Sequence, residues 1–437
     1  MVKADKIISA SWLFTAHNDD QLKEDHSVVV SNGIIHDIVP TSEVFGLYDA
    51  SDTYQLTDHV LLPGFINAHT HAAMTLFKGF ADDLALQDWL NNYIWPAEKE
   101  FVNYDFVRDG STHAIAEMIK GGTTTFNDMY FFPEATAEVV GKIGIRANIG
   151  LVLLEFPTNY AKDPREYLNK GLEFRDNWRD NPLITTSLAP HAPYSVSDES
   201  FEMINTYAEQ LDLTIHSHIH ETLNEIDDSK KQFGCSPIER LSELGILSPR
   251  LMAAHCVHLS NNDINLLSNN GVSILSNISS NMKLGSGLIN ISELFKNEMN
   301  IAIGTDSSAS NNRLDILTEM RSLALISKAL TMKSEFLNPS DIIKMATING
   351  AKALNIDDFT GSIAKGKSAD IIAFNLDSIE TQPCYDPLSS FLYCAHRQSC
   401  SYVWINGEIK LKENKLVCID ESEILQKAKA WKNRIKT

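Results

Sequence analysis

Short runs of β-forming residues alternate with longer amphipathic stretches through the middle of the chain. The runs predict eight strands, at 61–71, 123–130, 146–154, 183–191, 213–221, 251–258, 272–279 and 300–308. Helical patterns lie between them, for example at 105–120, 133–142, 198–211, 236–244, 260–269 and 315–330. Ser197 or Asp198 could cap the helix at 198–211, because a short oxygen side chain satisfies free amides there. This alternation is typical of a (β/α)8 barrel.

An open doubly wound sheet is the alternative to the barrel. Such a sheet usually carries a glycine-rich phosphate loop after its first strand. Here the first strand of the alternating region ends in His-x-His instead. The pattern therefore favours the barrel.

The two ends of the chain differ from the middle. Each end contains β-type runs, and in each an Asn-Gly pair, at 32–33 and 406–407, predicts a tight turn. Neither end alone holds enough strands for a stable core. We therefore predict an α/β protein that combines a TIM-like barrel with a small β-sandwich domain formed by both termini. The predicted domains are the barrel at 62–360 and the composite β domain at 1–61 plus 361–437.

Composition narrows the choice of partners and compartment. The formal net charge is −20, and such a surface repels phosphate backbones and anionic lipid. We expect no nucleic-acid partner and no membrane association. The six cysteines form no Cys-x-x-Cys pair, the N-terminus resembles no signal peptide, and no apolar run approaches the ~20 residues of a membrane span. These features predict free thiols and a cytoplasmic protein.

The first candidate for chemistry is the pair His69 and His71. Residues two apart on a strand point the same way, so both imidazoles can reach one metal ion. Such a pair is weak by itself, because exposed His-x-His pairs also occur by chance.

The second candidate is the run from His216 to Glu221. Alternation predicts that His216, His218 and His220 share one face, with Glu221 on the other side or beyond the strand end. Each buried ring nitrogen needs a partner, so we expect at least one of these histidines to bind a metal.

His255 and Asp306 follow two further strands. Each could be structural, His255 as a core histidine bonded to the backbone and Asp306 as a helix cap. Their joint placement decides the question, because carboxyl ends of barrel strands converge on one face, where active sites lie. The candidates at strand ends are His69 and His71 on the first strand, His191 on the fourth, His218 and Glu221 on the fifth, His255 on the sixth and Asp306 on the eighth.

Several motifs resemble those of the amidohydrolase superfamily. They are PGFINAHTH, the HxxE of the fifth strand, AAHCVHL, GTDSSASNN and GSIAKGKSADI. Three others, AHTHAAMTLFKGFADDLALQDWL, WPAE and APHAPYS, resemble the 5′-methylthioadenosine/S-adenosylhomocysteine deaminases and their triazine-hydrolase relatives. The resemblance spans nearly the whole chain. It implies a distorted (β/α)8 barrel and a small β domain built from both ends.

The resemblance also implies roles for individual residues. His218 rather than His216 is the implied metal ligand, because it stands three residues before Glu221. The implied metal ligands are His69, His71, His218 and Asp306; the catalytic residues are Glu221 as proton shuttle, His255 as orienter of the attacking water, and Asp306; the substrate contacts are Glu98, His191, Glu221 and Asp306. Glu98 could instead be a solvated charge at a helix start, and His191 a loop residue without a ligand.

The resemblance implies one divalent ion per subunit, with zinc as our first expectation. Two-metal relatives place a modified lysine at the end of the fourth strand, where this chain has His191. It further implies a homo-oligomer, a dimer or larger, that acts on a small nucleoside.

The implied reaction is deamination of 5′-methylthioadenosine to 5′-methylthioinosine and ammonia, with adenosine or S-adenosylhomocysteine as further substrates. Relatives that use S-adenosylhomocysteine have an arginine where this chain has Gly150 or Leu151, although Arg165 could substitute. The apolar run that follows suits a methylthio tail. Alternatives are a triazine hydrolase, a guanine or cytosine deaminase, or a non-enzymatic scaffold with a decayed site.

Overall fold

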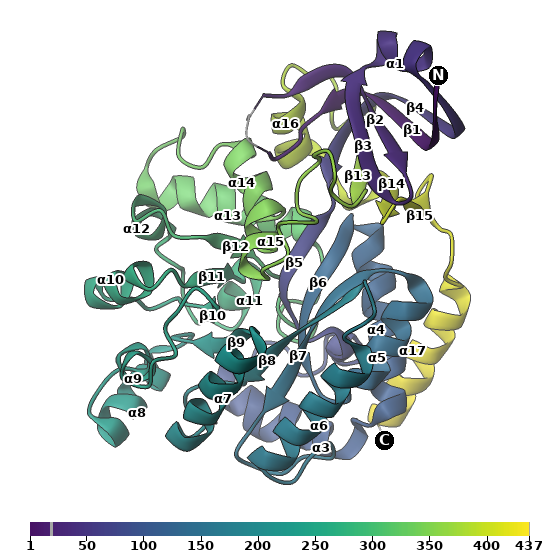
Figure 1. Cartoon of the computed structure of the whole chain (residues 1–437). Coiled ribbons are helices and arrows are strands. Elements are labelled where there is room, and N and C mark those ends of the chain that lie inside the picture. Colours follow the sequence, from purple (N-terminus) through teal and green to yellow (C-terminus); the bar gives the residue numbers. More distant parts are fainter. Residues whose placement is uncertain (18–20, 437) are drawn as a thin grey trace. The chain divides into compact units, whose positions relative to one another are not determined.

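A computed structural model describes residues 1–17 and 21–436 (Figure 1). Contacts divide the chain into two compact units. The first unit comprises Met1–Ile66, Ala116–Thr125 and Asp315–Ile419, and the second comprises Asn67–Ile115, Phe126–Leu314 and Asp420–Thr437. Helix α17 (Glu421–Ile435) belongs to the second unit, where Trp431 Nε1 donates to Asp109 Oδ2 at 3.0 Å. The domain boundaries near 62 and 360 stay a prediction.

The predicted barrel is confirmed by one sheet of eight strands in sequence order. Its strands are β5 (Phe65–Thr70), β6 (Thr123–Tyr130), β7 (Arg146–Leu153), β8 (Ile184–Pro190), β9 (Thr214–Ile219), β10 (Leu251–His255), β11 (Ser273–Ser276) and β12 (Ile301–Ile303). Past the end of β12, the amides of Thr305 and Asp306 donate to the carbonyl of His69 at 3.2 and 2.9 Å. These bonds join the last strand region to the first and close the barrel.

Helices separate the barrel strands, as the periodicity predicts. They are α4 (Tyr104–Lys120), α5 (Pro133–Ile143), α6 (Pro164–Trp178), α7 (Asp198–Leu211), α8 (Leu223–Phe233), α9 (Pro237–Glu243), α10 (Asn261–Asn269), α11 (Ile278–Lys283), α12 (Ile291–Lys296) and α13 (Ile316–Thr331). Ser197 caps α7, since its side chain accepts from the Ser200 amide at 3.2 Å. Of the two caps considered, the hydroxyl is therefore the one used.

A long excursion separates β5 from α4. It contains η1 (Ala72–Phe77), α2 (Leu86–Trp89), η2 (Leu90–Ile94) and α3 (Trp95–Phe101). The periodicity predicted none of these short elements, because each is too short for a helical repeat to show. They matter below, because this segment forms part of the wall of a cavity.

The first unit contains the composite sheet predicted from the two ends. Strand order interleaves them as β16-β15-β14-β13-β4-β1-β2-β3 in one continuous sheet. The bounds are β1 (Val2–Leu13), β2 (Lys23–Ser31), β3 (Ile34–Pro40), β4 (Tyr48–Pro63), β13 (Ile371–Asn375), β14 (Cys400–Ile405), β15 (Glu408–Lys412) and β16 (Lys415–Leu416). Both predicted Asn-Gly turns are present, with positive φ at all four residues, as a type I′ hairpin requires.

Short helices complete the first unit. They are α1 (Thr41–Leu47), α14 (Pro339–Met345), α15 (Ile348–Ala353), α16 (Pro387–Ser389), η3 (Ser390–Cys394) and η4 (Arg397–Ser399). All six cysteines are free, as expected. Within the described ranges, no helix is both long enough and apolar enough to cross a bilayer.

Candidate active site

The strand ends of the barrel hold backbone conformations that ordinary residues avoid. His255 has φ 73° and Asp306 has φ 62°, both in the left-handed region. Such conformations cost on the order of 1–3 kcal/mol each and cluster at functional sites. Both residues were singled out from the sequence, and they are two of the twenty non-glycine residues that the described chain holds at positive φ.

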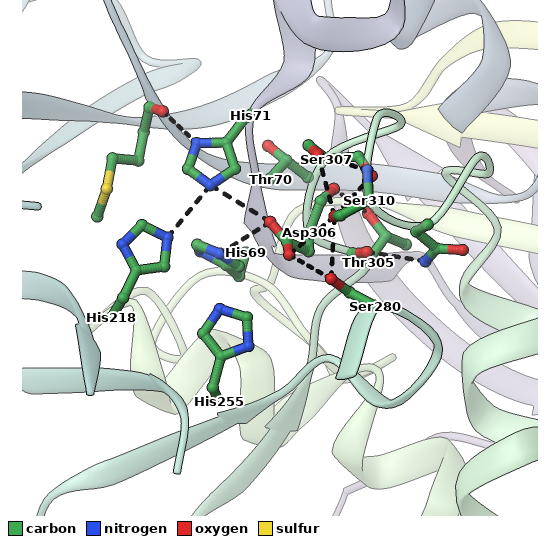
Figure 2. A network of polar contacts seen from close by, with 12 residues as sticks. His69, Thr70, His71, His218, His255, Ser280, Thr305, Asp306, Ser307 and Ser310 are labelled. Atoms are coloured by element: carbon green, nitrogen blue, oxygen red, sulfur yellow. Dashed lines mark hydrogen bonds and ion pairs between the residues drawn. The ribbon is translucent and has the colours of Figure 1, made fainter. Parts of the chain in front are cut away.

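His69, His71 and Asp306 converge at this end of the barrel (Figure 2). Asp306 Oδ1 lies 3.4 Å from His69 Nε2 and 3.3 Å from His71 Nε2. His71 Nε2 also lies 3.2 Å from His218 Nε2. The four side chains therefore present ligand atoms to one small volume.

The spacing of these atoms fits a tetrahedral metal ion. Ligands about 2.0–2.1 Å from such an ion are separated by about 3.3 Å, which matches the distances above. His69 Nε2 is buried and has no hydrogen-bond partner, although a buried ring nitrogen ordinarily has one. A metal ion would satisfy it. His255 is a further neighbour, because it forms a second candidate group with His69 and His218.

The other ring nitrogens hold the histidines in position. His71 Nδ1 donates to the Met129 carbonyl at 2.6 Å, and His218 Nδ1 donates to the His191 carbonyl at 2.7 Å. Each ring thereby keeps its Nε2 lone pair for a metal. Burial holds the pKa of His218 well below its usual range, so this imidazole is neutral, which is the form that binds metals.

His69 is oriented by a different partner. Its Nδ1 lies 2.7 Å from Nε2 of His216, which is fully buried. Burial also lowers the pKa of His69 to about 4. His216 is thus one of the inward histidines expected from alternation, and it lies behind the cluster.

His220 departs from the alternation that predicted three histidines on one face. Strand β9 ends at Ile219, and His220 has φ 53°. Its Nε2 accepts from the Ile238 amide at 3.3 Å, and its Nδ1 donates to the His258 carbonyl at 2.9 Å. The prediction that His220 shares the inward face is wrong, because the strand ends one residue earlier and the chain turns.

Two hydroxyls fix the carboxylate of Asp306. Ser280 donates to its Oδ2 at 2.6 Å and Ser310 at 3.0 Å, as Figure 2 shows. Burial alone would raise the pKa of Asp306, but contacts with His69 and His71 outweigh it and hold the pKa well below its usual range. The sequence contained both serines, but nothing in their spacing indicated this role.

Glu221 and His255 face one another beside the cluster. Glu221 Oε2 lies 3.9 Å from His255 Nε2, and Ser286 donates to Glu221 Oε1 at 3.3 Å. Asn281 Oδ1 accepts from His255 Nδ1 at 2.8 Å. Burial raises the pKa of Glu221, which makes this carboxyl a better proton carrier than an exposed one.

A cavity of about 310 Å³ opens over these groups, within the usual range for small-molecule sites. Of the eight predicted site residues, the cavity is lined by His71, Glu98, His191, His218, Glu221, His255 and Asp306, and His69 lies buried beside it. Aromatic and aliphatic side chains make up most of the remaining wall. The cavity therefore combines a compact polar end with a large apolar surface.

The two predicted substrate contacts have partners of their own. Tyr130 donates to Glu98 Oε1 at 2.8 Å. Burial raises the pKa of Glu98 to about 7, although the Tyr130 hydrogen bond and His71 oppose the rise. His191 Nδ1 lies 2.8 Å from the Ser195 hydroxyl. Neither residue is simply exposed on a loop or helix start.

Arg165 does not line the cavity. Its side chain is 82% exposed and lies 3.9 Å from Glu199. Among the described residues, Lys99 is the one lysine or arginine that lines the cavity. Sequence reasoning did not single it out. Its place in α3 is not readable from the sequence pattern, because that helix belongs to the unpredicted excursion.

A barrel with imidazoles and carboxylates gathered at its strand ends defines a hydrolase with a metal site. Residues 60–410 match the amidohydrolase family, and the chain belongs to that family. It is 41% identical over 99% of its length to a 5-methylthioadenosine/S-adenosylhomocysteine deaminase of Teredinibacter turnerae, of which it covers 98%.

One further relative by sequence and one by structure are also named as deaminases. The chain is 39% identical to a 5′-deoxyadenosine deaminase of Methanosphaera stadtmanae, over 94% of this chain and 95% of that protein. The crystal structure of an adenosine deaminase from Xanthomonas campestris with bound zinc superposes with a TM-score of 0.98 at 41% identity. That alignment covers 100% of this chain and 99% of the other.

Proposed function

We propose that this enzyme is a metal-dependent deaminase of adenine nucleosides, with 5′-methylthioadenosine as its first substrate. The observation that carries the proposal is the cavity, in which a compact polar end meets an apolar wall. The polar end suits hydrolysis of the exocyclic amine of the purine. The apolar wall suits a short thioether tail.

The proposed metal ligands are His69, His71 and Asp306, which form one candidate group, together with His218, whose Nε2 lies 3.2 Å from His71 Nε2; we propose one divalent ion per subunit, with zinc as the first expectation. When bound, such an ion lowers the pKa of water to about 7 and so provides a nucleophile at neutral pH. Three imidazole nitrogens and a carboxylate oxygen are ordinary zinc ligands. The relative from Xanthomonas campestris was crystallised with zinc.

The chain's own side chains then move the protons. Water adds its oxygen to C6 of the purine, and Asp306 accepts the proton that the water loses. Glu221 donates a proton to the adjacent ring nitrogen, so that negative charge does not build up there. His255, whose Nε2 lies 3.9 Å from Glu221 Oε2, orients the attacking water. Asp306 passes its proton to the amine, which leaves as ammonia, and the remaining C6 hydroxyl proton returns to Glu221, so that the ring retains a C6 carbonyl.

Glu98 and His191 hold the nucleoside in this proposal. Both line the same cavity as Glu221 and Asp306. Tyr130 and Ser195 restrict the rotation of the two side chains through the hydrogen bonds described above. A pre-oriented pair of polar groups lowers the entropic cost of binding the ring in one orientation.

The apolar wall favours a thioether tail over a charged one, which ranks S-adenosylhomocysteine below 5′-methylthioadenosine. The remaining features of the proposal are a cytoplasmic location, a homo-oligomer, and no nucleic-acid or membrane partner. The net charge of −20 supports the last of these.

Ammonia release is the direct test. The panel comprises 5′-methylthioadenosine, 5′-deoxyadenosine, adenosine, S-adenosylhomocysteine, guanine, cytosine and a chlorotriazine. We expect turnover of the adenine nucleosides only. Turnover of guanine, cytosine or the triazine without the nucleosides would overturn the proposal. A metal-loaded protein inactive on the whole panel would favour the scaffold alternative.

A further inference from the structure

Asp82, Lys283 and Asn312 form a closed triangle of hydrogen bonds. Lys283 Nζ donates to Asp82 Oδ1 and to Asn312 Oδ1, both at 2.6 Å, and Asn312 Nδ2 donates to Asp82 Oδ2 at 2.8 Å. A third bond runs from Lys283 Nζ to the Ala309 carbonyl at 3.2 Å. Every donor of the ammonium is thus engaged. The side chains of Lys283 and Asp82 are 23% and 31% exposed, so water screens this pair less than a surface pair.

The turn that carries Asp82 is held in an unfavourable backbone conformation. Ala81 and Asp83, on either side of it, have φ 62° and 63°, in the left-handed region that non-glycine residues avoid. Local propensity does not select this turn, so contacts from outside must stabilise it. The triangle supplies those contacts at the residue between the two strained positions.

The lysine also belongs to a helix that contacts the reacting end of the cavity. Helix α11 ends at Lys283. Ser280 on the same helix donates to Asp306 Oδ2 at 2.6 Å, and Asn281 accepts from His255 Nδ1 at 2.8 Å. One short helix therefore contacts two proposed catalytic residues and, through Lys283, the strained turn.

Directly after this turn comes the segment 86–101, which spans α2, η2 and α3. Its residues that line the cavity include Trp89, Trp95 and Glu98. In this subsection, 'the wall' means this segment, residues 86–101, and not the apolar lining of the whole cavity. Because the turn immediately precedes the wall, the position of Asp82 sets where the wall begins.

We propose that the Asp82–Lys283–Asn312 triangle is a positioning device. It holds the wall against the bound nucleoside, at a fixed distance from Asp306 and His255. Its expected effect is on substrate affinity rather than on the chemical step, since none of the three residues lines the cavity. The inference rests on the proposed function only for the choice of nucleoside in the kinetic assay.

The test replaces Lys283 by Met, which keeps much of the length and removes the charge. With 5′-methylthioadenosine we expect KM to rise roughly 10-fold, the size expected for loss of hydrogen bonds to a charged group, while kcat and metal content stay near those of the parent. Hydrogen–deuterium exchange of residues 86–101 should become faster. Lys283→Arg should restore part of the KM, because an arginine can still reach both oxygens.

The matched control is Lys296→Met. The side chain of Lys296 is 66% exposed and pairs with Glu293 on α12, so its removal should leave KM and exchange unchanged. If Lys283→Met folds poorly, Asp82→Asn removes the charge from the other side of the triangle and should give the same split between KM and kcat.

Unchanged KM and unchanged exchange in both triangle variants would overturn the proposal. So would an equal loss of kcat and metal content, which would indicate general damage to the site. The exchange measurement needs no turnover. If the parent protein deaminates no nucleoside, the proposed function fails, while exchange of the wall still decides whether the triangle holds it.

Discussion

The interior of the composite sheet and the strand ends of the barrel are both buried, but they are stabilised in different ways. In the sheet, the buried cluster around Trp404 and Ile8 is apolar. Burial of such side chains stabilises the fold by about 25 cal/mol per Å² without any ligand. At the barrel ends, the buried groups include imidazoles and carboxylates such as His69 and Asp306. Burying these groups is costly unless each has a partner.

Packing of side chains stabilises the buried groups of the sheet, but it does not fully stabilise those at the barrel ends. The sheet core is formed almost wholly by apolar side chains, and Trp404 Nε1 is its buried nitrogen without a hydrogen-bond partner among the described residues. The barrel ends gather buried imidazoles and carboxylates in one place, with His69 Nε2 lacking a hydrogen-bond partner and with His255 and Asp306 at positive φ. In the proposed function, a metal ion would satisfy the buried nitrogen of His69. The following changes test this difference.

Loss of a metal ligand should have the largest effect. We expect about one equivalent of divalent ion in the purified protein. His69→Ala and Asp306→Ala should lose the ion and reduce ammonia release to background. Elemental analysis and the ammonia assay measure both. Two tightly bound equivalents in the parent protein would contradict a single-ion site, and full metal occupancy in both variants would remove them from the ligand set.

Trp404→Ala tests the other side of the comparison. Trp404 is fully buried in the sheet cluster, so its truncation should lower the free energy of unfolding by about 3–5 kcal/mol. Chemical denaturation measures the loss. Metal content and KM of the folded protein should match the parent. A variant that folds but binds no metal would show that the sheet core supports the metal site as well.

Glu221→Gln should separate metal binding from chemistry. The amide keeps the shape of the side chain but cannot exchange a proton. Turnover should fall by roughly 100-fold or more, with metal content unchanged. Steady-state kinetics with metal analysis of the same sample provide the measurement. Turnover close to that of the parent would exclude Glu221 from the proton transfer.

The smallest expected effect concerns the substrate tail. An unpaired carboxylate brought against an apolar wall reduces binding, whereas a methylthio group gains from the contact. We expect kcat/KM for 5′-methylthioadenosine to exceed that for S-adenosylhomocysteine by at least about 10-fold, or roughly 1.4 kcal/mol. Steady-state kinetics on both thioethers measure the ratio.

Two variants identify the cation if the ratio is smaller than expected. Arg165→Ala should change neither substrate, because Arg165 is exposed and pairs with Glu199. Lys99 lines the cavity, so Lys99→Ala is the informative change. Equal efficiencies in the parent, with a selective loss for S-adenosylhomocysteine in Lys99→Ala, would mean that this lysine pairs with the carboxylate.

Much of the barrel could be predicted because its strands are marked by local composition. The predicted runs at 123–130 and 146–154 differ from β6 and β7 by no more than one residue at either end. The last strand was predicted at 300–308, whereas β12 is only Ile301–Ile303. The difference arises because the residues after β12 leave the ladder to bond His69 and to place Asp306 at positive φ.

The sequence by itself determined the alternation of strands and helices, both Asn-Gly hairpins, and the candidate ligands at strand ends. These are local properties, because a strand end or a tight turn is encoded within a few residues. Only the tertiary structure decided which groups complete the site. Ser280, Tyr130 and the carbonyl of His191 reach their partners from a helix, a strand and a loop that are distant in the sequence. Lys283 and Asp82 lie about 200 positions apart in the chain and still pair at 2.6 Å. Hydrophobic periodicity cannot predict such a contact, because the two residues meet only after the barrel closes.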